Sequence, residues 1–159
     1  MASGRPRSVV IGIGNPERGD DAAGRLVARR LRGKLPADVA IAEHDGESTA
    51  LLALLDGADT AILIDACVSG APAGTVRRFD ASASPLPEAK FSVSTHGLGL
   101  GEAVELARAL RALPRCCIVY TIESRAFDPG APLSPAVAAA VGETSERVRA
   151  EFALAEATP

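Results

Sequence analysis

The chain has 159 residues, 47% of them hydrophobic and 23% charged, and this length and composition fit a single soluble globular domain. Its formal net charge of −3 argues against a nucleic-acid-binding protein, which needs a basic surface to displace counterions, and no apolar stretch approaches the roughly 20 residues of a membrane span. Three cysteines without a disulfide framework, and a start without the apolar core of a signal peptide, predict a cytoplasmic protein with neither nucleic-acid nor membrane partners.

Strands and helices are expected to alternate along the chain. A short β-branched run predicts a first strand at residues 8–12, and a turn rich in Gly, Asn and Pro follows it. The first helix is expected over 20–32, with Asp20 as its N-cap and Asp21 as an acid in its first turn. Further strands are expected at 39–42, 60–64, 74–79 and 115–122, and further helices at 49–55, 98–113 and 135–154.

This alternation predicts an α/β fold. We expect a single three-layer domain over 1–159, with a twisted, mostly parallel five-stranded sheet and helices on both of its faces. The strand at 74–79 carries Arg77 and Arg78, so it is placed at an edge of the sheet and is expected to run antiparallel. Residues 1–7 and 155–159 are expected to be loose tails. Cys116 and Cys117 are adjacent in an apolar run and are expected to be small buried residues.

Asp21, Asp65 and His96 are candidates for a metal site. In an open parallel sheet the functional crevice lies beyond the carboxyl ends of the strands, and these residues follow predicted strands or precede a predicted helix. Two carboxylates and an imidazole suit a borderline divalent metal such as zinc or nickel, and three protein ligands leave coordination positions open for a substrate. Each residue alone also has an ordinary structural explanation, so the pattern predicts a rim of exposed ligands without naming the reaction.

Two other site types fit the residues less well. The sequence from Gly12 to Gly14 begins like a dinucleotide-binding turn, but Glu17 replaces the third glycine and two Asp residues at the helix start would repel a phosphate. A cysteine hydrolase would pair Cys67 with His96, although a small residue packed below the loop explains Cys67 more simply. A serine hydrolase is disfavoured because the chain has no G-x-S-x-G turn.

The segment GIGNPERGDDAAG at 12–24 resembles the N-terminal signature of the hydrogenase maturation proteases. The likeness continues in the same order through residues 63–66, 72–75, 94–100, 122–123 and 133–135, and so covers nearly the whole chain. The resemblance implies an endopeptidase that removes the C-terminal extension of a nickel–iron hydrogenase large-subunit precursor after nickel has been inserted. The expected partner is therefore that precursor, and the enzyme itself is expected to be a monomer or a weak homo-oligomer.

The resemblance also implies roles for the three candidate residues. The family's metal-contacting positions match Asp21, Asp65 and His96, which become the candidate catalytic and metal-binding residues, with Asp20 as a weaker candidate for the first position. Some members carry Glu where this chain has Asp21. The nickel is expected to be supplied by the substrate, so the resting enzyme need hold no metal, although zinc or cadmium would fit the same ligands in vitro. The metal can polarise the scissile carbonyl or activate a water, or one of the two Asp residues can act as a general base, and the sequence leaves these routes open.

Two alternative functions remain at this stage. The GIGNP turn at 12–16 is also similar to the start of the peptidyl-tRNA hydrolases. That family continues with a Gly, a Tyr and a catalytic His, whereas here Glu17 follows and no His occurs before His44. A non-catalytic binding module would keep the same three ligands and would bind a metal-loaded partner without cleaving it.

Overall fold

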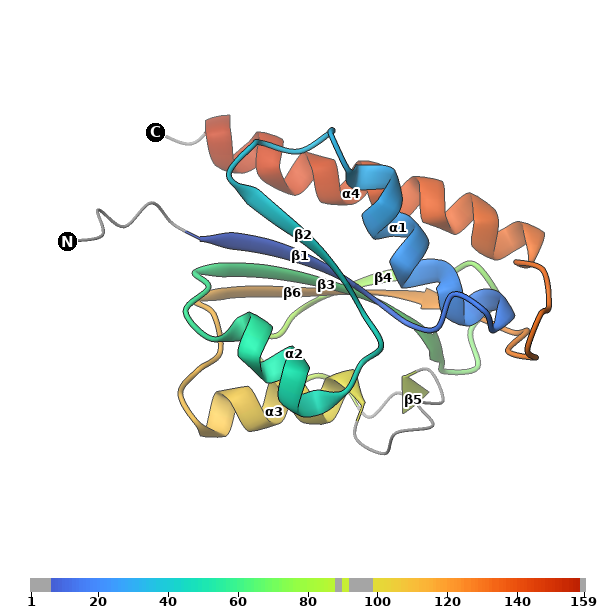
Figure 1. Ribbon diagram of the computed structural model, residues 1–159, viewed down its shortest axis with the longest axis horizontal. Coiled ribbons are helices and arrows are strands. Elements are labelled where there is room, and N and C mark those ends of the chain that lie inside the picture. Colours follow the sequence, from blue (N-terminus) through green and yellow to red (C-terminus); the bar gives the residue numbers. More distant parts are fainter. Residues whose placement is uncertain (1–6, 88–89, 92–98, 158–159) are drawn as a thin grey trace.

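The computed structural model describes residues 7–87, 90–91 and 99–157, which form a sheet between two layers of helices (Figure 1). In chain order the elements are β1 (Ser8–Ile13), η1 (Gly19–Ala22), α1 (Ala23–Leu31), β2 (Val39–His44), α2 (Ser48–Leu55), β3 (Thr60–Val68), β4 (Val76–Asp80), β5 (Lys90–Phe91), α3 (Leu100–Ala109), β6 (Cys116–Glu123) and α4 (Pro135–Ala157). None of the helices in these ranges is long and apolar enough to cross a membrane.

The main sheet has the strand order β2-β1-β3-β6-β4. Strands β2, β1, β3 and β6 run parallel, and β4 pairs antiparallel with β6 at one edge. The predicted α/β class, the five main strands and the antiparallel edge strand are therefore confirmed. The two-residue strand β5, which the sequence did not indicate, pairs antiparallel with the end of β3.

Each face of the sheet has its own apolar core. Helices α1 and α4 cover one face, where Val10, Ile62 and Tyr120 from three strands are buried beneath them. Helices α2 and α3 cover the other face, where Ile11 and Leu63 are buried. This alternation along each strand follows from the two-residue period of a β-strand, and it confirms the three layers.

Some boundaries differ from those expected. Strand β3 continues to Val68 rather than ending at residue 64, because residues 65–67 still pair with β6. The predicted first helix is a short 3-10 turn, η1, followed by α1. The last helix continues to Ala157 rather than 154, and α3 ends at Ala109 rather than 113. Cys117 is buried as expected, but the expectation for Cys116 was wrong, because its side chain is exposed at the start of β6.

Candidate active site

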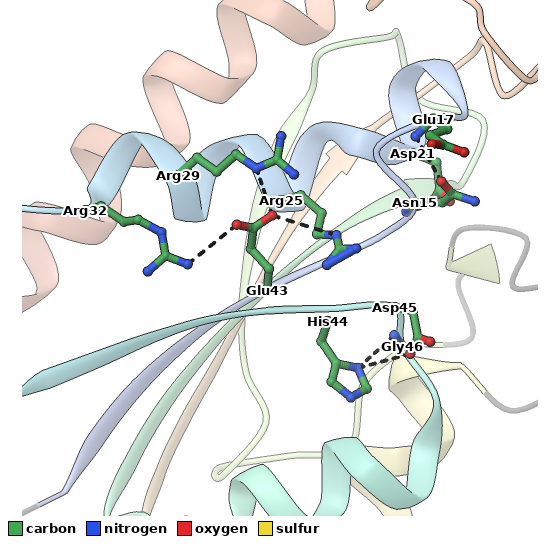
Figure 2. Close-up of polar contacts among 10 residues, drawn as sticks. All are labelled: Asn15, Glu17, Asp21, Arg25, Arg29, Arg32, Glu43, His44, Asp45 and Gly46. Atoms are coloured by element: carbon green, nitrogen blue, oxygen red, sulfur yellow. Dashed lines mark hydrogen bonds and ion pairs between the residues drawn. The ribbon is translucent and has the colours of Figure 1, made fainter.

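Asp21 lies in η1, just beyond the carboxyl end of β1. Its side chain is buried, with 5% of the residue exposed, and Oδ2 accepts a hydrogen bond from the backbone N–H of Asn15 at 3.1 Å. The Asn15 side chain in turn accepts the N–H of Glu17 at 2.9 Å, which fixes the turn between β1 and η1 (Figure 2). The carboxylate is therefore held in place by the loop that precedes it.

Glycines bring this turn unusually close to the sheet. A Cβ atom at Gly14, where φ is +143°, would lie 1.8 Å from the carbonyl oxygen of Asp21. A Cβ at Gly24 would lie 2.3 Å from the carbonyl oxygen of Ile64 and 2.4 Å from that of Ile13. No larger residue fits at either position, so η1 and the start of α1 can press against the ends of β1 and β3.

Asp65 directly follows Ile64 within β3, so the close approach of η1 to β3 places it at the same end of the sheet as Asp21. Only 2% of Asp65 is exposed, and its backbone pairs with Thr121 of β6. The expectation that Asp65 stands on an exposed rim was therefore wrong. The carboxylate is buried because β3 continues for three further residues between its neighbours instead of ending there.

Asp20 has a different role from its neighbour. The carboxylate was expected to cap its own helix, but that prediction was wrong, because it accepts hydrogen bonds from the loop before α4 instead. The donors are the N–H groups of Arg125, Ala126 and Ser134, at 2.8–3.0 Å, and the Ser134 hydroxyl at 2.8 Å. Burial opposes the charged form of Asp20, but these four hydrogen bonds outweigh it and hold the pKa of the carboxyl below its usual value.

A fourth buried carboxylate, Glu123, organises the loop after β3. It accepts hydrogen bonds from the N–H and hydroxyl of Ser69, from the N–H of Gly70 and from the thiol of Cys67. Burial opposes its charged form, but the bonds from Ser69, Cys67 and Gly70 outweigh this and lower its pKa. This role of Glu123 was not predicted, and its place at the end of an apolar strand was the one available signal.

Cys67 is not an activated nucleophile. Its side chain is buried beside Glu123, and burial together with that carboxylate raises the pKa of the thiol to about 12. A reactive cysteine needs a lowered pKa and an accessible sulfur. The geometry therefore contradicts the cysteine-hydrolase alternative.

The third predicted ligand, His96, lies outside the described residues. Within 7–87, 90–91 and 99–157 no group of three His, Cys, Asp or Glu side chains is arranged to hold a metal ion. The other histidine, His44, ends β2, and its Nδ1 accepts the N–H of Gly46 at 2.8 Å. Its ring points toward α2, on the side of β2 opposite Glu43 and α1 (Figure 2). The described structure thus brings Asp21 and Asp65 to one end of the sheet, while the three-residue metal site stays a prediction.

A sequence model of the hydrogenase maturation proteases, HycI, matches residues 27–151. The chain belongs to the hydrogenase maturation protease family. It is therefore a peptidase of hydrogenase maturation, as the resemblance at the motifs implied, and neither a peptidyl-tRNA hydrolase nor a non-catalytic binding module. The matched range includes Asp65 and His96 and begins after Asp21.

Solved structures of similar proteins agree with this family membership. The hydrogenase maturating endopeptidase HybD from E. coli is 26% identical, with a TM-score of 0.77, and the match covers 96% of this chain and 94% of that one. The [NiFe] hydrogenase maturation protease HycI from Thermococcus kodakarensis KOD1 is 28% identical, with a TM-score of 0.68 and 92% coverage of each chain. No curated protein sequence gives a significant match.

Proposed function

We propose that this peptidase removes the C-terminal extension of a nickel–iron hydrogenase large-subunit precursor after nickel insertion. Asp21, Asp65 and His96 contact the nickel that the substrate carries. The observation that supports this most is the placement of two buried carboxylates at one end of the sheet, at the carboxyl ends of parallel strands. The similarity to a [NiFe] hydrogenase maturation protease supports the class of substrate.

The burial of Asp21 and Asp65 explains how the enzyme would distinguish a precursor with nickel from one without it. A carboxylate removed from water loses hydration, and a second carboxylate nearby raises the cost of keeping both charged. A divalent cation offsets both costs, so a nickel-loaded precursor binds more tightly than a precursor without nickel. In this proposal the resting enzyme holds no metal, and zinc or cadmium added in vitro competes for the same ligands.

The third ligand, His96, precedes α3 in the sequence and would add an imidazole to the two carboxylates. Together they complete the coordination of a metal that substrate thiolates already hold. The substrate metal then polarises the scissile carbonyl or activates the attacking water. In this arrangement the enzyme's side chains place the metal, and the metal supplies the chemistry.

The test is cleavage of a purified large-subunit precursor, prepared with and without nickel, by wild type and by the variants Asp21→Asn, Asp65→Asn and His96→Ala. Each variant is expected to lose at least about 100-fold in kcat/KM, comparable with the loss of one transition-state contact in other enzymes. Asp21→Glu, which keeps a carboxylate, is expected to retain most of the activity.

Asp38→Asn is the matched control, because Asp38 is exposed and lies outside the site. Circular dichroism checks that each variant is folded. Full activity in folded Asp65→Asn would exclude Asp65 as a ligand, and equal cleavage of the precursor with and without nickel would exclude recognition of the metal.

A further inference from the structure

Two arginines on the side of α1 that faces β2, and a third just after the end of the helix, approach one carboxylate. Arg29 Nε is 2.8 Å from Glu43, Arg32 Nη2 is 3.5 Å from it, and Arg25 Nε is 3.9 Å from it (Figure 2). We call Arg25, Arg29 and Arg32 the arginine row. Arg25 and Arg29 are four positions apart and therefore share one face of α1, and Arg32 directly follows the last residue of the helix.

The arginine row carries more positive charge than Glu43 can neutralise. Three guanidinium groups and one carboxylate leave a local charge of +2 on a chain whose net charge is −3. About half of the side-chain surface of Arg29 and Arg32 is exposed, at 49% and 52%. The exposed guanidinium groups of Arg29 and Arg32 can therefore donate hydrogen bonds to an acidic partner.

Within the described ranges, no strand pairs with the outer edge of the neighbouring strand β2. It stands at the end of the strand order, and none of its six residues is buried. The carbonyl oxygen of His44 accepts the N–H of Gly14, the residue that follows β1, so by alternation the backbone groups of Ile41 and Glu43 point away from β1. Such an edge pairs readily with an extended peptide.

The two features match in geometry. Alternate side chains of a strand added to β2 would lie about 6.6 Å apart on the α1 side, and Arg25 and Arg29 are separated by about 6 Å along the helix axis. Strand β2 and the start of α1 both lead to the end of the sheet where Asp21 lies (Figure 2). A peptide on this edge is thus directed toward the candidate active site.

We propose that the arginine row and the open edge of β2 together bind an extended segment of the protein substrate that carries acidic residues at alternate positions. This inference rests on the proposed function, because it assigns the segment to the protein that is cleaved. The open strand edge recognises a polypeptide backbone, which favours a peptide over a nucleic acid as the occupant.

The proposal is tested with fluorescein-labelled peptides and fluorescence anisotropy on the full chain. One peptide alternates Glu with Thr, a second replaces each Glu by Gln, and a third has the same composition as the first with its Glu residues contiguous. The alternating Glu peptide is expected to bind most tightly, and its Kd should rise with salt concentration. For the double variant Arg29→Gln/Arg32→Gln, we expect its Kd to rise roughly tenfold.

Arg111→Gln/Arg115→Gln is the matched control, since both arginines are exposed on the α3–β6 connection and the charge change is identical. Equal affinity for the Glu and Gln peptides, or for wild type and Arg29→Gln/Arg32→Gln, would overturn the proposal. Equal affinity for the alternating and contiguous peptides would overturn pairing with β2. Preference for a single-stranded RNA oligonucleotide would assign the surface to nucleic acid instead.

Precursor cleavage separates this inference from the proposed function. Arg29→Gln/Arg32→Gln is expected to raise KM while kcat is retained, because the row lies outside the reacting atoms. Asp65→Asn is expected to lower kcat while the peptides still bind. An unchanged KM in the arginine variant would exclude a role in substrate binding even if nickel-dependent cleavage is observed.

Discussion

Asp20 and Asp21 are adjacent and chemically identical, yet their surroundings give them separate tasks. Asp20 is fully buried, and its four hydrogen bonds tie η1 to the loop before α4. The Asp21 carboxylate instead accepts a hydrogen bond from the backbone N–H of Asn15, in the turn that precedes η1. The first acid thus fixes the position of the second, which leaves Asp21 as the one directed to the substrate in the proposed function.

The hydrogen bonds of Asp20 predict a pH-dependent contribution to stability. Its folded pKa is lowered below the ordinary 3.8, so the contribution is complete above that pH and is lost as the pH falls through the folded pKa. Asp20→Asn places an amide NH₂ against N–H donors and is expected to lower the free energy of unfolding by about 2 kcal/mol at neutral pH. Urea denaturation of both proteins between neutral and acid pH measures this difference.

The difference in the free energy of unfolding between wild type and Asp20→Asn should become smaller as the pH falls below 3.8. The reason is that the side chain at position 20 takes up a proton only in the wild type. The other carboxylates titrate in both proteins, so their contributions cancel in this difference. The exposed substitution Asp38→Asn should produce no comparable difference. If the difference in the free energy of unfolding stayed constant at acid pH, this would contradict a charged Asp20 in the folded protein.

The role of Asp20 shows where the sequence stops being informative for single residues. A capping prediction considers only the amides that follow the residue, whereas the first donor to Asp20 is 105 positions away, at Arg125. Glu123 was missed for the same reason, since Ser69 precedes it by 54 positions. Asp21 and Asp65 were identified as site candidates because strand ends are visible in the sequence, but their burial depends on the packing of η1 and the length of β3.

At the level of elements, the contact of α1 with the sheet depends on the absence of a side chain at Gly24. Its Cβ would meet two backbone carbonyl oxygens that cannot move independently of β1 and β3. Gly142, in the middle of α4, differs, because its Cβ would lie 3.6 Å from Arg30 Nη2, an ordinary contact with a flexible side chain. Replacing glycine by alanine should therefore change the stability of the protein in opposite directions in the two helices.

Gly24→Ala is expected to destabilise the protein by about 2–3 kcal/mol, because overpacking forces α1 away from the sheet. It should also impair cleavage, since η1 and Asp21 move with α1. Gly142→Ala is expected to stabilise by roughly 0.5–1 kcal/mol through a better helix-forming residue. Thermal and urea unfolding measure both effects. A neutral or stabilising Gly24→Ala would contradict the tight packing of α1 against β1 and β3.

Element types were easier to predict than element ends. The apolar run at 60–64 marks the centre of β3, but pairing of 65–67 with β6 needs only backbone groups, which the side-chain pattern does not report. Likewise, the apolar spacing over 20–32 predicted a helix. The divided form of that region, η1 followed by α1, follows from glycine contacts with the sheet that appear only in three dimensions.

For the whole molecule, the alternation of strands and helices was sufficient to predict three layers, whereas the strand order was not predicted. The order β2-β1-β3-β6-β4 makes β3 the central strand and leaves β2 and β4 at the edges. It thereby brings Asp65 into the interior and opens β2 to a partner. One sheet separates the two apolar cores, and residues adjacent in a strand, such as Val10 and Ile11, belong to opposite cores.

This shared sheet predicts that the two cores unfold together, as the expected single domain over 1–159 requires. Tyr120 is the only tyrosine and the chain has no tryptophan, so intrinsic fluorescence reports on one position. That position is buried in the core under α4, where its hydroxyl donates to Glu151 at 2.6 Å. Helices α2 and α3 on the other face contribute to far-ultraviolet circular dichroism together with α1 and α4.

In urea, the fluorescence and circular dichroism transitions are expected to coincide, with the same midpoint and slope, because neither core can lose the sheet without exposing the other. Leu63→Ala, in the core under α2 and α3, tests the coupling directly. It should shift the Tyr120 transition by the same free energy as the circular dichroism transition, about 2–5 kcal/mol for a buried leucine. A Tyr120 transition that stays in place while circular dichroism shifts would show that the two faces unfold separately and would contradict the single domain.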